Sequence, residues 1–118
     1  MGNEKKVLYV DDEEINLLIL TRQLQKKFKV YTAESGEEGL KILKSNTDLE
    51  FIISDLKMPQ MSGLEFIKRA NELFHNKRYF LLTGSTMSDE VKKAIESGLI
   101  EKCWVKPVNF ENIENYLK

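Results

Sequence analysis

The 118-residue sequence predicts a doubly wound α/β fold, in which a five-stranded parallel sheet carries helices on both faces. Five short β-prone runs alternate with five segments of helical periodicity, a pattern typical of βαβ units with right-handed crossovers. The third run, residues 49–55, is almost continuously apolar, as expected for a strand covered on both faces. The length and the 42% of hydrophobic residues indicate one domain, residues 1–118, around one core.

The individual elements follow from composition and periodicity. The expected strands are residues 6–10, 29–33, 49–55, 78–84 and 103–105. The expected helices are residues 15–28, 35–46, 62–74, 88–98 and 109–118. Their apolar spacing predicts the helical side chains that face the core. These are Leu17, Leu20, Leu24, Phe28, Leu64, Ile67, Phe74, Val91, Ala94, Ile95, Phe110, Ile113 and Leu117.

Polar residues indicate where three of the helices begin. Ser35 with Glu38, and Ser62 with Glu65, have the spacing of a capping box, in which side chains satisfy free N–H groups of the first turn. Asn109 is the expected N-cap of the last helix, since an asparagine oxygen accepts from the same groups.

Composition excludes several classes of protein. The chain has 18 basic and 19 acidic residues and a net charge of −1, which gives no electrostatic case for binding nucleic acid or an anionic membrane. No apolar run reaches the roughly 18 residues of a membrane-spanning helix. The N-terminus lacks the apolar core of a signal peptide. Cys103 is the single cysteine, so no internal disulfide forms, and a cytoplasmic location is expected.

Chemically distinctive residues follow four of the five predicted strands. Asp11 and Asp12 follow the first strand, Asp55 ends the third, Thr83 ends the fourth and Lys106 follows the fifth. Binding sites in open parallel sheets form outside the carboxyl ends of the strands. We therefore expect three carboxylates, one hydroxyl and one lysine at the same edge.

Each of these residues also has a purely structural interpretation. Asp12 alone is suited to cap the first helix, and Asp55 alone to an Asx turn. Thr83 alone is ordinary at a strand end, and Lys106 alone is able to extend into solvent. Taken together these interpretations weaken, because three neighbouring carboxylates repel one another unless a cation is present.

A hard divalent cation suits the expected acidic cluster. Mg²⁺ binds one or two carboxylates and keeps waters that a phosphate group replaces. A zinc site is not expected, because zinc sites are built from several cysteine and histidine ligands and the chain has only Cys103 and His75.

Four segments of the chain resemble the signature of the response-regulator receiver domain of two-component signalling. They are YVDDEEIN, ISDLKMPQMSG, LLTGS and VKP, and their order and spacing match over essentially the whole chain. The resemblance implies a sheet with strand order 2-1-3-4-5. It also implies that the chain is a regulatory domain and not an enzyme. Such a domain promotes its own phosphorylation and dephosphorylation.

The resemblance implies a role for each residue at the acidic edge. Asp55 would be the phosphoacceptor for a sensor histidine kinase or a histidine phosphotransfer protein. Asp12 and Asp55 would bind Mg²⁺ directly, Asp11 directly or through water, and Lys57 through its backbone carbonyl. Thr83 would hydrogen-bond the phosphoryl group.

Lys106 would form an ion pair with the same phosphoryl group, and the Lys106–Pro107 peptide bond is expected to be cis. Pro59 and Gly63 match the family's turn after the acceptor. Lys57 and Ser85 are expected at the rim of the pocket, as solvated side chains or as residues that tune the lifetime of the phosphorylated state.

The sequence departs from the family at the position three residues before Lys106. Many members have an aromatic residue there, which swings inward when the hydroxyl on the fourth strand moves toward the phosphoryl group. Here it is Cys103, while Trp104 beside it is expected on the opposite face of the strand. The interval from Gly98 to Lys106 is also one residue longer than usual. The sequence therefore does not show whether a movement of Thr83 is transmitted to the outer surface of the domain.

Other classes of protein fit less well. A haloacid-dehalogenase-type phosphatase needs a D-x-D pair after its strand, and a nucleotide-binding fold needs a glycine-rich loop after the first strand; this chain has neither. A pseudo-receiver that only binds partners is the remaining alternative, although the acidic set is complete.

The resemblance also implies a surface for self-association or for binding effectors, which comprises the fourth helix, fifth strand and fifth helix. The sequence does not show whether the chain acts alone or within a longer regulator.

Overall fold

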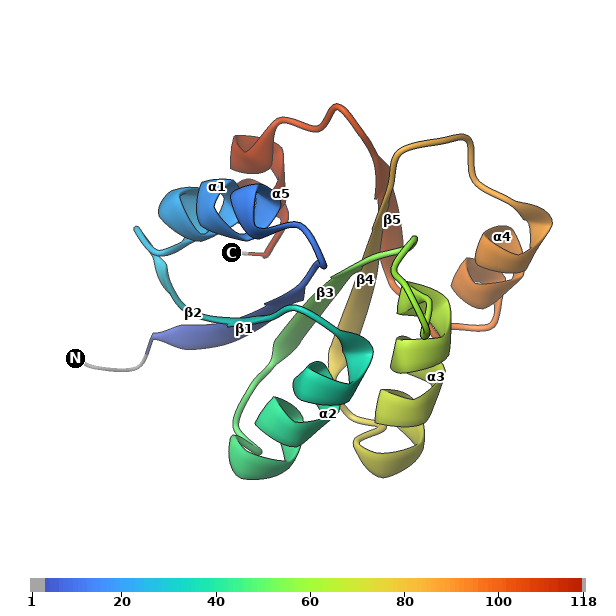
Figure 1. Cartoon of the computed structure of the whole chain (residues 1–118), viewed down its shortest axis with the longest axis horizontal. Coiled ribbons are helices and arrows are strands. Elements are labelled where there is room, and N and C mark those ends of the chain that lie inside the picture. The colour runs from blue at the N-terminus through green and yellow to red at the C-terminus, as the bar shows by residue number, and fades with distance from the viewer. Residues whose placement is uncertain (1–3, 118) are drawn as a thin grey trace.

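The computed structural model describes residues 4–117, which form a five-stranded parallel sheet with strand order β2-β1-β3-β4-β5 (Figure 1). This is the order that the resemblance implied. The strands are β1 Lys5–Val10, β2 Phe28–Ala33, β3 Phe51–Asp55, β4 Arg78–Thr83 and β5 Lys102–Val105. The helices are α1 Glu14–Leu24, α2 Gly36–Ser45, α3 Gly63–Leu73, α4 Asp89–Glu96 and α5 Phe110–Leu117. Because all strands run the same way, their carboxyl ends lie at one edge of the sheet.

Helices cover both faces of the sheet. Leu17 and Leu20 of α1 pack with Ile113 of α5 against one face. The helices α2, α3 and α4 cover the other face (Figure 1). Strand residues alternate between the two sides, so that Leu8 packs toward α2 and α3 whereas Tyr9 packs toward α1 and α5. The prediction of a doubly wound fold is therefore confirmed.

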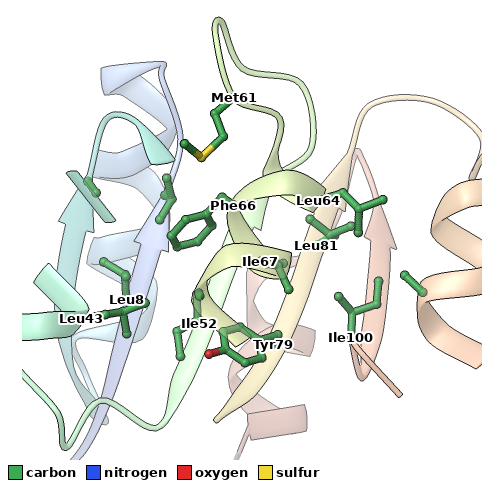
Figure 2. Packing of buried hydrophobic residues seen from close by; sticks show 14 of the residues in the cluster. Leu8, Leu43, Ile52, Met61, Leu64, Phe66, Ile67, Tyr79, Leu81 and Ile100 are labelled. Atoms are coloured by element: carbon green, nitrogen blue, oxygen red, sulfur yellow. The ribbon is translucent and has the colours of Figure 1, made fainter. Parts of the chain in front are cut away.

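The core beneath α2, α3 and α4 is mainly aliphatic. Figure 2 shows Phe66 and Ile67 of α3 resting on strand side chains such as Leu8 and Ile52. These residues are fully buried, and each large apolar side chain contributes about 1.5–3 kcal/mol through burial. This packing fixes the strands on which the residues of the acidic edge are carried.

Most predicted helix starts are confirmed at the level of hydrogen bonds. Ser35 accepts from the N–H of Glu38, and Ser62 accepts from that of Glu65. The carboxylate of Glu38 accepts from the N–H of Glu34 rather than from that of Ser35, so the capping box is shifted by one residue. The side chain of Asn109 accepts from the N–H of Glu111 and caps α5 as expected.

Phe28 lies in a different element from the one that the sequence predicts. The sequence places it on the inward face of the first helix, but α1 ends at Leu24 and Phe28 begins β2. Its ring is still buried, and meets Phe51 edge to face at 6.0 Å. Helical spacing continued by chance through the turn between α1 and β2, so periodicity alone could not separate the two elements.

No helix within residues 4–117 combines the length and apolar character needed to cross a membrane.

Arg78 and Glu101 form a two-pronged ion pair at the edge of the sheet opposite the acidic residues. Arg78 donates to both carboxylate oxygens at 2.8 and 2.6 Å, and the hydroxyl of Tyr116 also donates to Glu101 at 2.9 Å. The hydrogen bonds from Arg78 hold the pKa of Glu101 below its usual value. The pair therefore stabilises the fold above the pKa of unfolded Glu101, and this stabilisation disappears as the pH falls through the lower, folded pKa.

The variant Glu101→Gln is expected to lower the free energy of unfolding by no more than about 1 kcal/mol near neutral pH, because the pair is partly exposed. The difference from wild type should shrink as the pH falls below the usual carboxyl range and through the lowered pKa of Glu101. Urea unfolding of both proteins at neutral and at acidic pH measures it. A difference that grows in acid would contradict the assigned sign.

Candidate functional site

The five residues predicted to meet do lie at the carboxyl edge of the sheet. Asp11 directly follows β1, Asp55 ends β3, Thr83 ends β4 and Lys106 directly follows β5. Carboxylate oxygens of Asp11, Asp12 and Asp55 all lie within 4.8 Å of one another. The sheet order explains this convergence, since β1 and β3 are neighbours and β4 pairs with β3.

The three carboxylates differ in their surroundings. Asp11 is fully buried, whereas Asp12 is exposed. Asp11 accepts from the hydroxyl of Tyr9 at 2.6 Å and from the N–H of Glu13 at 2.9 Å. The N-cap of α1 is Glu13, so the interpretation of Asp12 as a helix cap is wrong. Asp12 is left with its carboxylate near the other two and open to solvent.

Lys106 forms an ion pair with Asp55, and so is not a side chain that merely extends into solvent. Its Nζ lies 2.8 Å from Oδ1 of Asp55. The backbone N–H of Lys106 donates to the carbonyl of Thr83 at 2.7 Å, which ties the lysine to the end of β4. The Lys106–Pro107 bond is cis, as predicted.

Burial and neighbouring charge set the protonation of this pair. Burial raises the pKa of Asp55, and the charges of Asp11 and Asp12 add to this, so that they outweigh the hydrogen bond from Lys106. Burial lowers the pKa of Lys106, but the hydrogen bond and charge of Asp55 more than offset it, and the pKa is raised. The site thus has an excess of negative charge that one lysine does not balance, and a bound cation would relieve it.

The loop between β3 and α3 packs directly on the backbone of Asp55. The N–H of Gly63 donates to the carbonyl of Leu56 at 2.8 Å, and Ser54 Oγ donates to the carbonyl of Asp55 at 2.9 Å. A Cβ on Gly63 would lie 2.1 Å from that same carbonyl oxygen, which is far inside van der Waals contact. Glycine is therefore required where this loop turns into α3. Pro59 lies in the loop before it.

Residues 7–118 match the family described as the response regulator receiver domain. The chain belongs to this family.

Relatives and solved structures of receiver domains agree with the match. Sensor histidine kinase RcsC of Escherichia coli is 29% identical over 98% of this chain, which spans only 12% of the length of RcsC. The chemotaxis protein CheY4 of Vibrio cholerae is 30% identical, with a TM-score of 0.86 over 96% of this chain and 95% of CheY4. A response regulator from Burkholderia pseudomallei, solved with a phosphorylated aspartic acid, calcium ion and citrate, is 30% identical. Its TM-score is 0.84, over 97% of this chain and 66% of that one.

Lys57 and Ser85 both line an open groove of about 610 Å³ between the β3–α3 and β4–α4 loops. Their place at the rim of the phosphoryl site stays a prediction. Thr83 is buried beside this groove, and its Oγ1 accepts from the N–H of Ser85 at 3.3 Å. The hydroxyl predicted to contact a phosphoryl group is thus hydrogen-bonded to the backbone of the β4–α4 loop.

Cys103 and Trp104 of this receiver domain point to opposite faces of β5, as the strand periodicity predicts. Cys103 packs in the cluster beneath α4 with Leu81 and Ile100, whereas Trp104 stacks on Phe80 with ring centroids 5.4 Å apart. Burial raises the pKa of the Cys103 thiol to about 11, so the thiol is protonated at neutral pH. Its role as a switch with Thr83 stays a prediction.

An aromatic side chain at position 103 is expected to fit poorly. Cys103 is 8% exposed and surrounded by packed aliphatic residues, so Cys103→Tyr should lower the free energy of unfolding by about 1–3 kcal/mol. Lys102→Tyr, at the exposed neighbouring position, should change it by no more than about 0.5 kcal/mol. Chemical denaturation of the two variants makes the comparison. Equal effects would mean that position 103 is not closed to a large ring.

Tyr9 is the site residue that the sequence did not single out. It reads as an ordinary strand residue, and its ring is indeed buried in the core. Its hydroxyl nevertheless emerges at the acidic edge and donates to Asp11. Burial and this hydrogen bond hold the pKa of Tyr9 far above its usual value, so it stays a donor. The sequence did contain a signal for this contact, because Tyr9 precedes Asp11 by two residues and residues two apart in a strand lie on the same face of the sheet.

Proposed function

We propose that this receiver domain, residues 1–118, accepts a phosphoryl group on Asp55 in a Mg²⁺-dependent reaction and thereby changes its partner-binding surface. The donor is a phosphohistidine of a sensor histidine kinase or a histidine phosphotransfer protein. The observation that carries the proposal is the position of Asp55, between the ammonium group of Lys106 and the carboxylates of Asp11 and Asp12. A solved relative with a phosphorylated aspartic acid supports the same chemistry.

The donor set fits Mg²⁺. Three carboxylates with oxygens within 4.8 Å of one another supply hard ligands, and one of them, on Asp12, is exposed and accessible to an incoming ion. Asp11, Asp12 and Asp55 would hold the ion, together with the backbone carbonyl of Lys57. When bound, Mg²⁺ would supply positive charge that neutralises the transferring phosphoryl group.

The residues of the chain position the transfer itself. A carboxylate oxygen of Asp55 attacks phosphorus in line as the phosphorus–nitrogen bond to the donor imidazole breaks, leaving an acyl phosphate on Asp55. Lys106, already 2.8 Å from Asp55, pairs with the added charge, and the Thr83 hydroxyl donates to a phosphoryl oxygen. Water later hydrolyses the acyl phosphate, so the domain acts as a reversible regulator and not as an enzyme with a separate substrate.

Partner contacts are proposed on the surface formed by α4, β5 and α5. Val105 and Tyr116 are large apolar side chains that are 44% and 40% exposed there. The alternative, a pseudo-receiver regulated without phosphorylation, is less favoured because the acidic set, Thr83 and Lys106 all lie at one edge.

Incubation with acetyl phosphate and Mg²⁺ tests the proposal. Intact mass spectrometry should show one added phosphoryl group per chain, and an excess of EDTA should prevent it. Beryllofluoride with Mg²⁺ should bind at the same site and block subsequent labelling. A protein that gains no phosphoryl group at saturating acetyl phosphate, with Mg²⁺ present, would refute the proposed function.

A further inference from the structure

A buried hydrogen bond joins Tyr9 to Asp11 at the acidic edge. The Tyr9 hydroxyl donates to Oδ2 of Asp11 at 2.6 Å, which is the distance of a charge-assisted bond from a hydroxyl to a carboxylate. Tyr9 is 1% exposed and Asp11 is fully buried, so bulk solvent does not reach this bond. No step of the phosphoryl transfer proposed above uses the hydroxyl. Its contact with a proposed metal ligand nevertheless gives it a means of acting on the site.

Two donors set the orientation of the Asp11 carboxylate. Tyr9 donates to Oδ2, and the backbone N–H of Glu13 donates to Oδ1 at 2.9 Å. The ring of Tyr9 is held in the core cluster that contains Leu20 of α1, and Glu13 is the N-cap of the same helix. Because each oxygen has its own donor, rotation of the carboxylate out of this plane breaks hydrogen bonds that solvent does not replace. The core and the start of α1 therefore hold Asp11 in one orientation.

The side-chain donor to Asp11 is uncharged, unlike the donor to Asp55. Lys106 gives Asp55 both a hydrogen bond and a positive charge. The phenol of Tyr9 gives Asp11 a hydrogen bond alone. A second ammonium group at this edge would repel a bound cation, whereas a neutral hydroxyl does not. Tyr9 thus orients one of the three clustered carboxylates and leaves its negative charge available to an ion.

We propose that Tyr9 is a positioning residue, which orients Asp11 for Mg²⁺ and makes the site prefer Mg²⁺ to Ca²⁺. This inference rests on the metal site of the proposed function. Mg²⁺ demands near-ideal octahedral geometry, whereas Ca²⁺ accepts flexible arrangements of its ligands. A carboxylate held at both oxygens therefore suits Mg²⁺, and loss of one donor penalises Mg²⁺ more than Ca²⁺. Hydrogen-bond partners of metal ligands contribute roughly 10–100-fold to metal affinity.

The variant Tyr9→Phe tests the role of the hydroxyl, because it keeps the buried ring. Titration with each ion, followed by the amide chemical shifts of the acidic edge, gives the two dissociation constants. The dissociation constant for Mg²⁺ should rise about tenfold relative to wild type. The dissociation constant for Ca²⁺ should rise less than about threefold. An unchanged value for Mg²⁺, or an equal rise for the two ions, would overturn the inference.

Tyr79→Phe is the matched control. Tyr79 is 2% exposed, and its hydroxyl donates to the backbone carbonyl of Phe74 at 2.6 Å, near the start of β4 and away from the acidic edge. The control removes an equally buried hydroxyl, so it should change both dissociation constants by less than about twofold.

The outcomes separate this inference from the proposed function. A rise of about tenfold for Mg²⁺ in Tyr79→Phe as well would assign the effect to lost stability and would refute a specific role for Tyr9. Wild-type protein whose acidic edge shows no shift with Mg²⁺ would overturn the metal site, and the inference with it. Wild-type protein that binds Mg²⁺ while Tyr9→Phe binds it equally well would overturn the inference alone.

Discussion

The variant Asp55→Asn is expected to lose all Mg²⁺-dependent labelling by acetyl phosphate while keeping its fold. An amide is not a nucleophile toward phosphorus, and it removes one of the three charges that attract the cation. The amide is almost isosteric with the carboxylate, and its carbonyl oxygen still accepts a hydrogen bond from Lys106. Mass spectrometry measures the labelling, and circular dichroism with thermal unfolding measures the fold.

Asp48→Asn is the matched control for that result. Asp48 is exposed and forms its ion pair with Lys6 at the opposite edge of the sheet. The control removes the same charge without touching the site, so labelling should proceed as in wild type. Stoichiometric labelling of Asp55→Asn itself would show that the acceptor is another residue.

Among the glycines of residues 4–117, Gly63 is the position where an added methyl group is expected to lower the free energy of unfolding most, as in the variant Gly63→Ala. The new Cβ would lie 2.1 Å from the backbone oxygen of Asp55 and 2.9 Å from Oγ of Ser54. The clashing oxygen belongs to the backbone of a fully buried strand, so rotation of a side chain does not relieve the overlap. We expect a loss of about 3 kcal/mol in the free energy of unfolding, measured by urea denaturation. Labelling of Asp55 should also slow, because the strand that carries it must shift.

Gly84→Ala is the control for the added methyl group. Gly84 follows Thr83 at the same edge, and a Cβ there would meet no atom within 4 Å. The substitution should be neutral or stabilise by up to about 1 kcal/mol through the unfolded chain. If the two alanine variants were equally unstable, the close packing of the loop on Asp55 would not be the cause.

The positions of Asp11, Asp55, Thr83 and Lys106 could be predicted because strand ends depend on local patterns. Each follows a short apolar run, and a parallel sheet brings such ends together without any knowledge of register. The strand order itself rested on the resemblance, since alternation of elements does not distinguish among several doubly wound orders.

Features that depend on tertiary packing could not be predicted. The shared strand face of Tyr9 and Asp11 indicated that the two residues lie near each other, but the hydrogen bond itself depends on the packing of the Tyr9 ring beneath α1. The helix α1 ends at Leu24 because Phe28 is buried as the first residue of β2, and helical spacing does not reveal this. The exclusion of a side chain at Gly63 likewise arises from contact with the backbone at the end of β3 rather than from a local turn signal.

The opposite orientations of Cys103 and Trp104 have a spectroscopic consequence. Trp104 is the only tryptophan, and it stacks on Phe80 and meets Tyr116 edge to face, all on the side covered by α1 and α5. Its emission therefore reports on that half of the molecule, while a thiol-specific probe or a labelled methionine at Met61 reports on the half beneath α2, α3 and α4. Following the two signals after phosphoryl transfer would separate the responses of the two faces of one sheet.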